Sequence, residues 1–207
     1  MSTNPAILSD LDGTLIDSKA SVIRAFEWWA DLRGLPAGVA ERIPHGRTST
    51  AAAAVLAPHL DAEFEGAILD AHQAEDTVGV VALPGALELL SSHPRIAIVT
   101  SCPLPLANAR LRAAGLPVPA VLVTPELTAN GKPDPEPYLL GASLLGVAPD
   151  ACVVLEDAPA GIAAGLAAGM RVVAVLTTHD RSDLPGASAY IAELAELAKA
   201  LATLATP

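Results

Sequence analysis

Two carboxylates one residue apart, Asp10 and Asp12, follow the first apolar run of the chain and precede Gly13 and Thr14. Close carboxylates repel one another and resist dehydration, so folding alone gives no reason for the pair. The stretch therefore indicates that positive charge is brought to this point of the fold.

Further polar residues follow later apolar runs, or lie in the loop after one, in the same way. They are Thr100, Ser101, Lys132, Glu156 and Asp157. In an open parallel sheet, ligands bind beyond the carboxyl ends of the strands, so these groups are expected at one edge of the sheet. Two acidic ends, one hydroxyl end and one lysine predict a site for Mg²⁺ and phosphate, because Mg²⁺ prefers hard oxygen ligands and commonly bridges to phosphate.

Each group also has an ordinary structural explanation. The DxDG stretch could open a calcium loop, but that loop needs glycine at its sixth position, where this chain has Leu15. The Thr100-Ser101 and Glu156-Asp157 pairs could be helix caps, and Lys132 could be a solvated turn residue. The prediction depends on all of them occurring in this order at strand ends.

Four apolar runs have strand character, and two weaker runs resemble them. The four are 6–11, 95–100, 152–157 and 171–177, and the weaker two are 120–124 and 189–194. Helical stretches lie between them at 85–93, 105–115, 135–146 and 159–169. Continuous Val/Ile runs are typical of strands buried on both faces of a parallel sheet. The alternation predicts an α/β fold, a doubly wound parallel sheet. Glycines 161, 165 and 169 indicate a helix that packs closely on that sheet.

The segment from about 18 to 82 breaks this rhythm, because it holds helical stretches and no convincing strand. These stretches are 21–34, 48–60 and 62–75. We expect a small all-helical cap domain at 17–82, inserted into a core domain formed by 1–16 and 83–207, with hinges at 14–18 and 80–84. Trp28 and Trp29 diverge by ~100° on a helix, so only one of them can face the core fully.

Composition restricts the partners and the location of the chain. A length of 207 residues allows one domain with a smaller insert, and a formal net charge of −11 argues against nucleic acid or an anionic membrane as a partner. Cys102 and Cys152 are expected at opposite edges of the sheet, too far apart to pair. The first residues lack the basic region of a signal peptide, and the longest weakly polar stretch is broken by Gly169 and Arg171. We expect a soluble, cytoplasmic monomer.

The polar groups resemble, in order, the four motifs of the haloacid dehalogenase superfamily, over nearly the whole chain. The matching segments are Asp10-Leu11-Asp12-Gly13-Thr14, Thr100-Ser101, Lys132-Pro133-Asp134 and Glu156-Asp157-Ala158-Pro159-Ala160-Gly161. The helical insert matches the position of the small helical cap of that family. The chain is most similar to its sugar and polyol phosphatases, which act on hexose, hexitol and glycerol phosphates, and Pro44-His45-Gly46-Arg47 resembles the His-Gly segment of that branch.

The resemblance implies covalent catalysis. Asp10 would attack phosphorus and form an aspartyl-phosphate. Asp12 would protonate the leaving alkoxide and then deprotonate the water that hydrolyses the intermediate. The dehalogenase reaction has no alkoxide to protonate, and relatives with that activity lack the second aspartate. Asp12 therefore favours phosphoryl transfer.

The resemblance also implies a metal and a phosphate site. Thr100 or Ser101 would bind phosphoryl oxygens, and Lys132 would neutralise charge during the transfer. The ligands implied for Mg²⁺ are Asp10, the backbone carbonyl of Asp12, Asp157 and, directly or through water, Glu156.

In the cap, His45 and Arg47 are predicted to donate hydrogen bonds to substrate hydroxyls or phosphate. The alternative is that they are surface residues at a helix start, since Thr48 and Ser49 resemble an N-cap. Two positions depart from the family pattern. Ser9 stands where relatives carry a bulky apolar residue, and Cys102 stands where Gly or Asn is more familiar.

The leading hypothesis is a Mg²⁺-dependent phosphatase that acts on a small sugar or polyol phosphate. A hexose-phosphate mutase of the same fold is the alternative, although Thr14 and the His-Gly-Arg segment favour hydrolysis. Phosphonate cleavage uses a lysine of the cap. The one candidate here, Lys19, lies at the very start of the cap, which argues against that reaction. A catalytically silent binding module would have lost one of Asp10, Asp12, Lys132 and Asp157, and all four are present. The sequence does not name the substrate.

Overall fold

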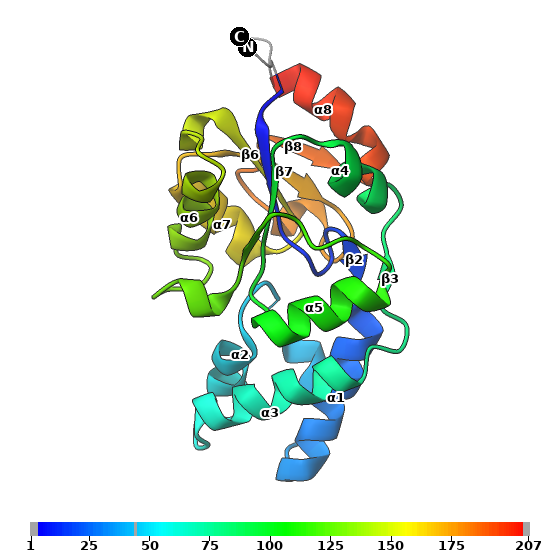
Figure 1. Ribbon diagram of the computed structural model, residues 1–207. Coiled ribbons are helices and arrows are strands. Elements are labelled where there is room, and N and C mark those ends of the chain that lie inside the picture. Colours follow the sequence, from blue (N-terminus) through cyan, green and yellow to red (C-terminus); the bar gives the residue numbers. More distant parts are fainter. Residues whose placement is uncertain (1–3, 44, 205–207) are drawn as a thin grey trace.

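A parallel six-stranded sheet forms the centre of the molecule (Figure 1). The computed structural model describes residues 4–43 and 45–204. Within these, the strand order is β5-β4-β1-β6-β7-β8, and each neighbouring pair is parallel. The strands are β1 (Ala6–Ser9), β4 (Ile96–Val99), β5 (Val121–Val123), β6 (Cys152–Glu156), β7 (Arg171–Val175) and β8 (Ala189–Ile191). The doubly wound parallel sheet predicted from the apolar runs is confirmed.

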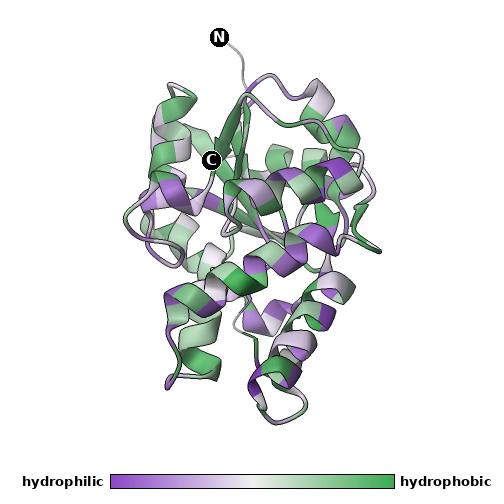
Figure 2. Ribbon diagram, turned by 60° about the horizontal axis from the view of Figure 1, so that its bottom comes forward, coloured by the Kyte–Doolittle hydropathy of each residue, from purple (hydrophilic) through white to green (hydrophobic). Residues whose placement is uncertain are grey.

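Helices cover both faces of this sheet, which explains why its strands are apolar throughout. Every residue of β1, β4 and β6 is buried. One face packs on α6 (Glu136–Leu144) and α7 (Pro159–Ala167), and the other on α4 (Ala86–Ser92), α5 (Leu104–Ala113) and α8 (Leu197–Leu204). Figure 2 shows the strands coloured as hydrophobic, while the helices carry hydrophilic residues. Short 3₁₀ turns complete this part of the chain: η2 (Pro125–Leu127), η3 (Pro149–Ala151), η4 (Arg181–Asp183) and η5 (Leu194–Glu196).

The glycines of α7 allow the close packing that their spacing indicated. A Cβ atom at Gly165 would lie 2.9 Å from Val172 Cγ2, and one at Gly161 would overlap the Glu156 carboxylate. Gly169 has a different role, because it follows the helix with φ of 74°. Gly161 therefore brings the start of α7 against the strand end that carries Glu156, and Gly165 brings the later part of the helix against β6 and β7.

The inserted segment between residues 18 and 80, called the cap segment below, is mainly helical and has its own apolar cluster. It contains α1 (Lys19–Arg33), η1 (Val39–Arg42), α2 (Ser49–Leu56) and α3 (Ala62–Glu75). Trp29 is fully buried and donates to Glu65 at 2.6 Å, whereas Trp28 is 37% exposed and stacks on His72 at 3.8 Å. This confirms that one of the two tryptophans faces the core.

The cap segment leaves and re-enters the rest of the chain through a two-stranded antiparallel ladder. Its strands are β2 (Ile16–Asp17) and β3 (Val81–Ala82). Each strand has only two residues, so the apolar pattern of the sequence did not reveal them. Both lie in the stretches expected to act as hinges. None of the helices in residues 4–43 and 45–204 combines the length and apolarity needed to cross a membrane.

Candidate active site

The strand ends meet beside a cavity between the sheet and the cap helices. Strand β1 lies between β4 and β6, so the chain connections diverge there, as they do where open α/β sheets bind ligands. The cavity has a volume of about 540 Å³. Core residues that line it include Asp10, Asp12, Thr100, Ser101 and Asp157, and cap residues include His45, Arg47, Ser49 and Asp70.

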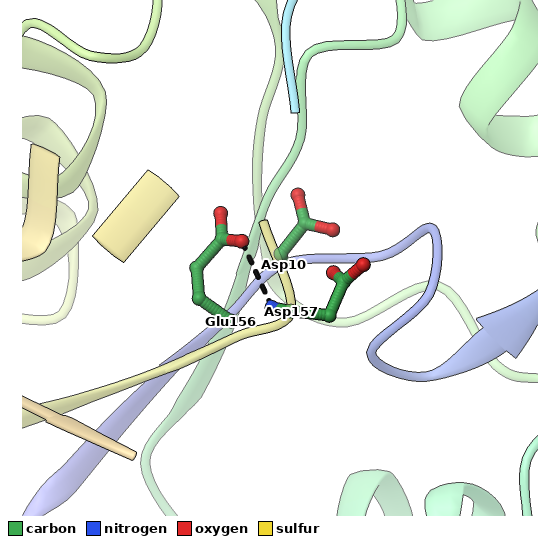
Figure 3. Close-up of side chains that lie close together, drawn as sticks. All are labelled: Asp10, Glu156 and Asp157. Atoms are coloured by element: carbon green, nitrogen blue, oxygen red, sulfur yellow. Dashed lines mark hydrogen bonds between the residues drawn. The ribbon is translucent and has the colours of Figure 1, made fainter. Parts of the chain in front are cut away.

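Three buried carboxylates gather at the ends of β1 and β6. Asp10, Glu156 and Asp157 each offer an oxygen within 4.8 Å of the others (Figure 3). Lys132 Nζ lies 2.6 Å from Asp10 Oδ1 and 2.7 Å from Glu156 Oε1, and it donates to the Val99 carbonyl at 2.9 Å. When all four groups are ionised, one ammonium faces three carboxylates and the cluster carries a charge of −2.

The uncompensated charge is visible in the acid–base properties of the cluster. Burial, opposed by the charge of Lys132, raises the pKa of Asp10 well above its ordinary value. Burial and the neighbouring Glu156 raise the pKa of Asp157 to about 7. Burial lowers the pKa of Lys132, but the charges of Asp10 and Glu156 outweigh it and raise this pKa above its ordinary value. A lysine ion pair thus neutralises only part of the site.

The metal-free protein should lose stability as the pH rises towards 8. A carboxyl whose pKa is raised from 3.8 to about 7 binds more protons in the folded than in the unfolded state between these values. The free energy of unfolding is therefore highest below pH 3.8 and falls by about 1–4 kcal/mol as the pH rises from there through about 7. Thermal unfolding in EDTA between pH 5 and 8 measures this decline.

Asp157→Asn should flatten that decline, and Mg²⁺ should oppose it because a cation favours the deprotonated carboxylates. An unfolding temperature in EDTA that stays constant or rises between pH 5 and 8 would contradict the raised pKa of Asp157.

The carboxylate oxygens of the cluster fit a hard divalent cation, and hydrogen bonds orient the Asp157 carboxylate towards the other carboxylates. Thr14 Oγ1 donates to Asp157 Oδ1 at 2.9 Å, and Thr178 Oγ1 donates to Asp157 Oδ2. Gly13 has φ of +87°, and a Cβ atom there would overlap the Asp157 carboxylate. The backbone of β1 thus leaves room for this carboxylate beside Asp10. Oxygen donors with a net negative charge are those that Mg²⁺ prefers.

Glu156 differs from the other two carboxylates because protein donors already occupy both of its oxygens. Oε1 accepts from Lys132 at 2.7 Å and from Tyr138 at 2.9 Å, and Oε2 accepts from the backbone N–H groups of Asp157 and Ala158 at 3.1 and 3.2 Å. The dashed line in Figure 3 marks the bond from Asp157. Glu156 is therefore built to hold Lys132 and the loop after β6.

Asp12 lines the same cavity as Asp10 but has a separate set of partners. Its Oδ1 accepts from Ser18 at 2.7 Å, and its Oδ2 lies 2.8 Å from Arg110 Nη1 and 3.0 Å from Cys102 Sγ. Sequence reasoning missed Arg110. The available signal was its position on α5, since it shares the apolar stripe of that helix with Leu106, four residues earlier.

The residues after β4 connect the core to the cap. Thr100 is buried and its Oγ1 accepts from the Cys102 N–H at 3.1 Å. Ser101 Oγ donates to the carbonyl of Gly46 at 2.9 Å. A Cβ atom at Gly46 would lie 2.8 Å from Ala158 Cβ, and Gly46 has φ of +78°. The loop that contains Gly46 therefore lies close to the loops that follow β4 and β6, and only glycine fits at this position.

Gly46→Ala should lower kcat/KM by about 5- to 30-fold, because a side chain at positive φ costs about 1–2 kcal/mol and the new methyl group prevents the approach to Ala158. Gly34→Ala is the matched control. Gly34 has φ of +64° and an empty surrounding, so its substitution should reduce stability alone. Phosphate-release kinetics and thermal unfolding separate the two effects, and equal kinetics for both variants would show that the contact is unimportant.

The predicted cap residues line the cavity beside the core residues. His45 and Arg47 line it, and the His45 ring meets the ring of His179 edge-on at 5.2 Å. Partial burial and the neighbouring His179 and Lys19 lower the pKa of His45. Thr48 is the N-cap of α2, as its position indicated, and accepts from the Ala51 N–H at 3.1 Å. Pro44, in the same predicted segment, lies outside the described residues.

The two departures from the family pattern have local consequences. Ser9 is fully buried and donates to the Asp10 carbonyl at 2.7 Å, so its hydroxyl does not remain unpaired. Cys102 accepts a bond from Arg110 Nη1 at 2.8 Å. Both cysteines are free, with Cys102 beyond the carboxyl end of β4 and Cys152 at the amino end of β6, as expected.

Comparison with known proteins gives consistent matches over most of the chain. The family described as haloacid dehalogenase-like hydrolase matches residues 5–169. Hexitol phosphatase A of Escherichia coli K12 is 47% identical over 180 residues, which cover 84% of this chain and 83% of that protein. Glycerol-1-phosphate phosphohydrolase 2 of Saccharomyces cerevisiae is 34% identical over 193 residues, or 84% of this chain and 76% of that protein. The crystal structure of a hydrolase from Pseudomonas syringae superposes with a TM-score of 0.86 at 26% identity, covering 98% of this chain and all of that one.

Proposed function

Because the chain belongs to the haloacid dehalogenase-like hydrolase family, we propose that it is a Mg²⁺-dependent phosphatase that hydrolyses a small sugar or polyol phosphate through an aspartyl-phosphate. The named relatives above act on a hexitol phosphate and on glycerol 1-phosphate. The observation that carries the proposal is the buried cluster of Asp10, Lys132, Glu156 and Asp157 at the edge of the cavity.

Asp10 is the proposed nucleophile. Its carboxylate attacks phosphorus, the bond from phosphorus to the leaving oxygen breaks, and the phosphoryl group is transferred to Asp10. Asp12 protonates the leaving alkoxide and afterwards removes a proton from the water that attacks the aspartyl-phosphate. Inorganic phosphate leaves and Asp10 is regenerated. The separate partners of Asp12 are consistent with a role different from that of Asp10.

Lys132 and the cluster around it stabilise the charge of the transferred group. Asp10 and Asp157, with the backbone carbonyl of Asp12, would hold Mg²⁺, which supplies positive charge to the phosphoryl oxygens when bound. We assign Glu156 to holding Lys132, since its oxygens already have protein donors. Direct contact of Glu156 with the metal is therefore not part of the proposal.

The remaining predicted residues are assigned to substrate binding. Thr100 and Ser101 bind phosphoryl oxygens beside Asp10, and His45 and Arg47 contact the substrate from the cap. We propose that 17–82 is a cap domain that closes over the core formed by 1–16 and 83–207, and that Ser101 and Gly46 meet in the closed arrangement. Closure excludes water from the reacting group.

Phosphate release from a panel of sugar and polyol phosphates, with Mg²⁺ or with EDTA, tests the proposal. We expect release that requires the metal. Conversion of a hexose 1-phosphate to the 6-phosphate without release would instead identify a mutase. Absence of any turnover, with Mg²⁺ bound, would indicate a silent binding protein.

A further inference from the structure

A series of hydrogen bonds runs along one wall of the cavity, from Asp12 to the cap helices. Arg110 Nη1 lies 2.8 Å from Asp12 Oδ2, and its Nη2 donates to Gln73 Oε1 at 2.7 Å. Gln73 Nε2 donates to Ser49 Oγ at 3.3 Å, and Ser49 Oγ donates to Asp70 Oδ1 at 2.6 Å. All five residues line the cavity. This polar wall therefore begins at the proposed proton-transfer carboxylate and ends on α2 and α3.

The polar wall retains unused hydrogen-bonding capacity within the described residues. Arg110 is 2% exposed, yet its Nε has no partner there. Asp70 accepts one hydrogen bond, from Ser49, and no cation of the described residues forms an ion pair with it. Burial raises its pKa to about 6. Buried polar atoms normally have partners, so a ligand in the cavity is the expected source of those that are missing.

The arrangement of donors and acceptors indicates which ligand would fit. A hydroxyl group can donate to the Asp70 carboxylate and accept from Arg110 Nε, so a ligand with several hydroxyls matches the two ends of the wall. The Gln73 amide instead holds the wall together, because its Nε2 donates to Ser49 Oγ and to the Leu69 carbonyl. A second anionic group would not match. Besides Asp70, the same cavity is lined by Asp17, Glu27 and Glu41, and these acids outnumber the cations Lys19 and Arg47 that also line it.

We propose that Ser49, Asp70, Gln73 and Arg110 form a subsite for the hydroxyl groups of the leaving group, so that the substrate is the phosphate ester of a neutral polyol or sugar. The inference rests on the proposed function. The subsite lies several side chains beyond Asp12, so the leaving group must reach from the phosphate to the cap. We therefore expect a six-carbon polyol to engage more of the wall than glycerol does.

Asp70→Asn tests the subsite on three esters: sorbitol 6-phosphate, glycerol 1-phosphate and para-nitrophenyl phosphate, whose leaving group carries no hydroxyl for the wall to bind. We expect kcat/KM for sorbitol 6-phosphate to fall by about 10- to 100-fold, because a buried charged hydrogen bond is lost. The kcat/KM for para-nitrophenyl phosphate should change by less than about 3-fold, because its leaving group has no hydroxyl that could bond to Asp70. Glu75→Gln, an exposed acid on the same helix, is the matched control and should leave all three values unchanged.

A purely structural tie between α2 and α3 makes a different prediction. Asp70→Asn would then lower the rates for all three esters equally, and that result, or no change at all, would overturn the subsite. Ser49→Ala should repeat the selective loss, and thermal unfolding shows whether either variant is folded.

Binding separates this proposal from the proposed function. Sorbitol 6-phosphate can be titrated calorimetrically into Asp10→Asn and into the same variant carrying Asp70→Asn. Weaker binding to the second protein, with no phosphate release by the wild type, would support the subsite and reject the phosphatase. Equal binding with normal release would do the opposite.

Discussion

Replacing Asp10 by Asn is expected to abolish phosphate release without destabilising the metal-free protein. Loss of a covalent nucleophile lowers kcat by about four orders of magnitude or more. Stability behaves differently, because Asp10 is one of three carboxylates that share one lysine. Burial raises the pKa of Asp10, so its charge is unfavourable in the folded state at neutral pH. Lys132 keeps Glu156 as a partner when Asp10 is neutral.

Rapid-quench or steady-state phosphate release measures the first effect, and thermal unfolding in EDTA measures the second. Asp150→Asn, at an exposed aspartate of the core, is the control and should alter neither. Unfolding at a temperature well below that of the wild type would show that Asp10 is mainly a structural partner of Lys132. Turnover near the wild-type rate would reject Asp10 as the nucleophile.

Replacing Lys132 by Met is expected to remove both activity and stability. The ammonium is buried between Asp10 and Glu156, and its removal leaves buried carboxylates without a cation. Breaking such a pair costs about 3–5 kcal/mol. Loss of a preorganised charge at the transferring phosphoryl group lowers kcat by about 10²- to 10³-fold. Lys199→Met, at an exposed lysine on α8, is the control.

The pH dependence and a second substitution identify the cause of that loss. Because the carboxyls of Asp10 and Asp157 already have raised pKa values, protonation at low pH removes the repulsion, so the stability difference between Lys132→Met and the wild type should narrow as the pH falls. Adding Glu156→Gln to Lys132→Met should restore part of the stability and none of the activity. A stability difference independent of pH would indicate lost packing against Tyr138 instead.

The parts of the fold that could be predicted are those whose signal is local. The runs that became β1, β4, β6 and β7 are apolar throughout because both faces of the sheet are covered, and this leaves a pattern in the sequence. Helix α8 lies outside the predicted stretches, just after the run 189–194 that was expected as an edge strand and that contains β8. The ladder of β2 and β3 is too short to produce a pattern of its own.

In the site, most core residues found from sequence directly follow a strand, and Lys132 lies in the loop after β5, whereas the residues missed do not share one rule. Thr178 lies in the loop after β7 and its hydroxyl contacts Asp157, so the strand-end argument would have found it if β7 had been included. Arg110 lies within a helix, and its contact with Asp12 depends on how α5 packs over the loop after β1. Gln73 is the partner of Arg110 across 37 residues of sequence, a pairing that no local pattern specifies. Which residues from the cap reach the site is decided by tertiary packing.

The β2–β3 ladder has a consequence for how such a chain can diversify. Because the helical segment leaves and returns through adjacent strands, the two points of attachment are neighbours, and β1 pairs with β4 and β6 without any help from it. A segment joined in this way can be exchanged for another of different length while the surrounding sheet remains intact. Grafting α1–α3 from a relative with another preference between Ile16 and Ala82 should therefore transfer the choice of leaving group as a cassette and leave the chemistry at phosphorus to the recipient.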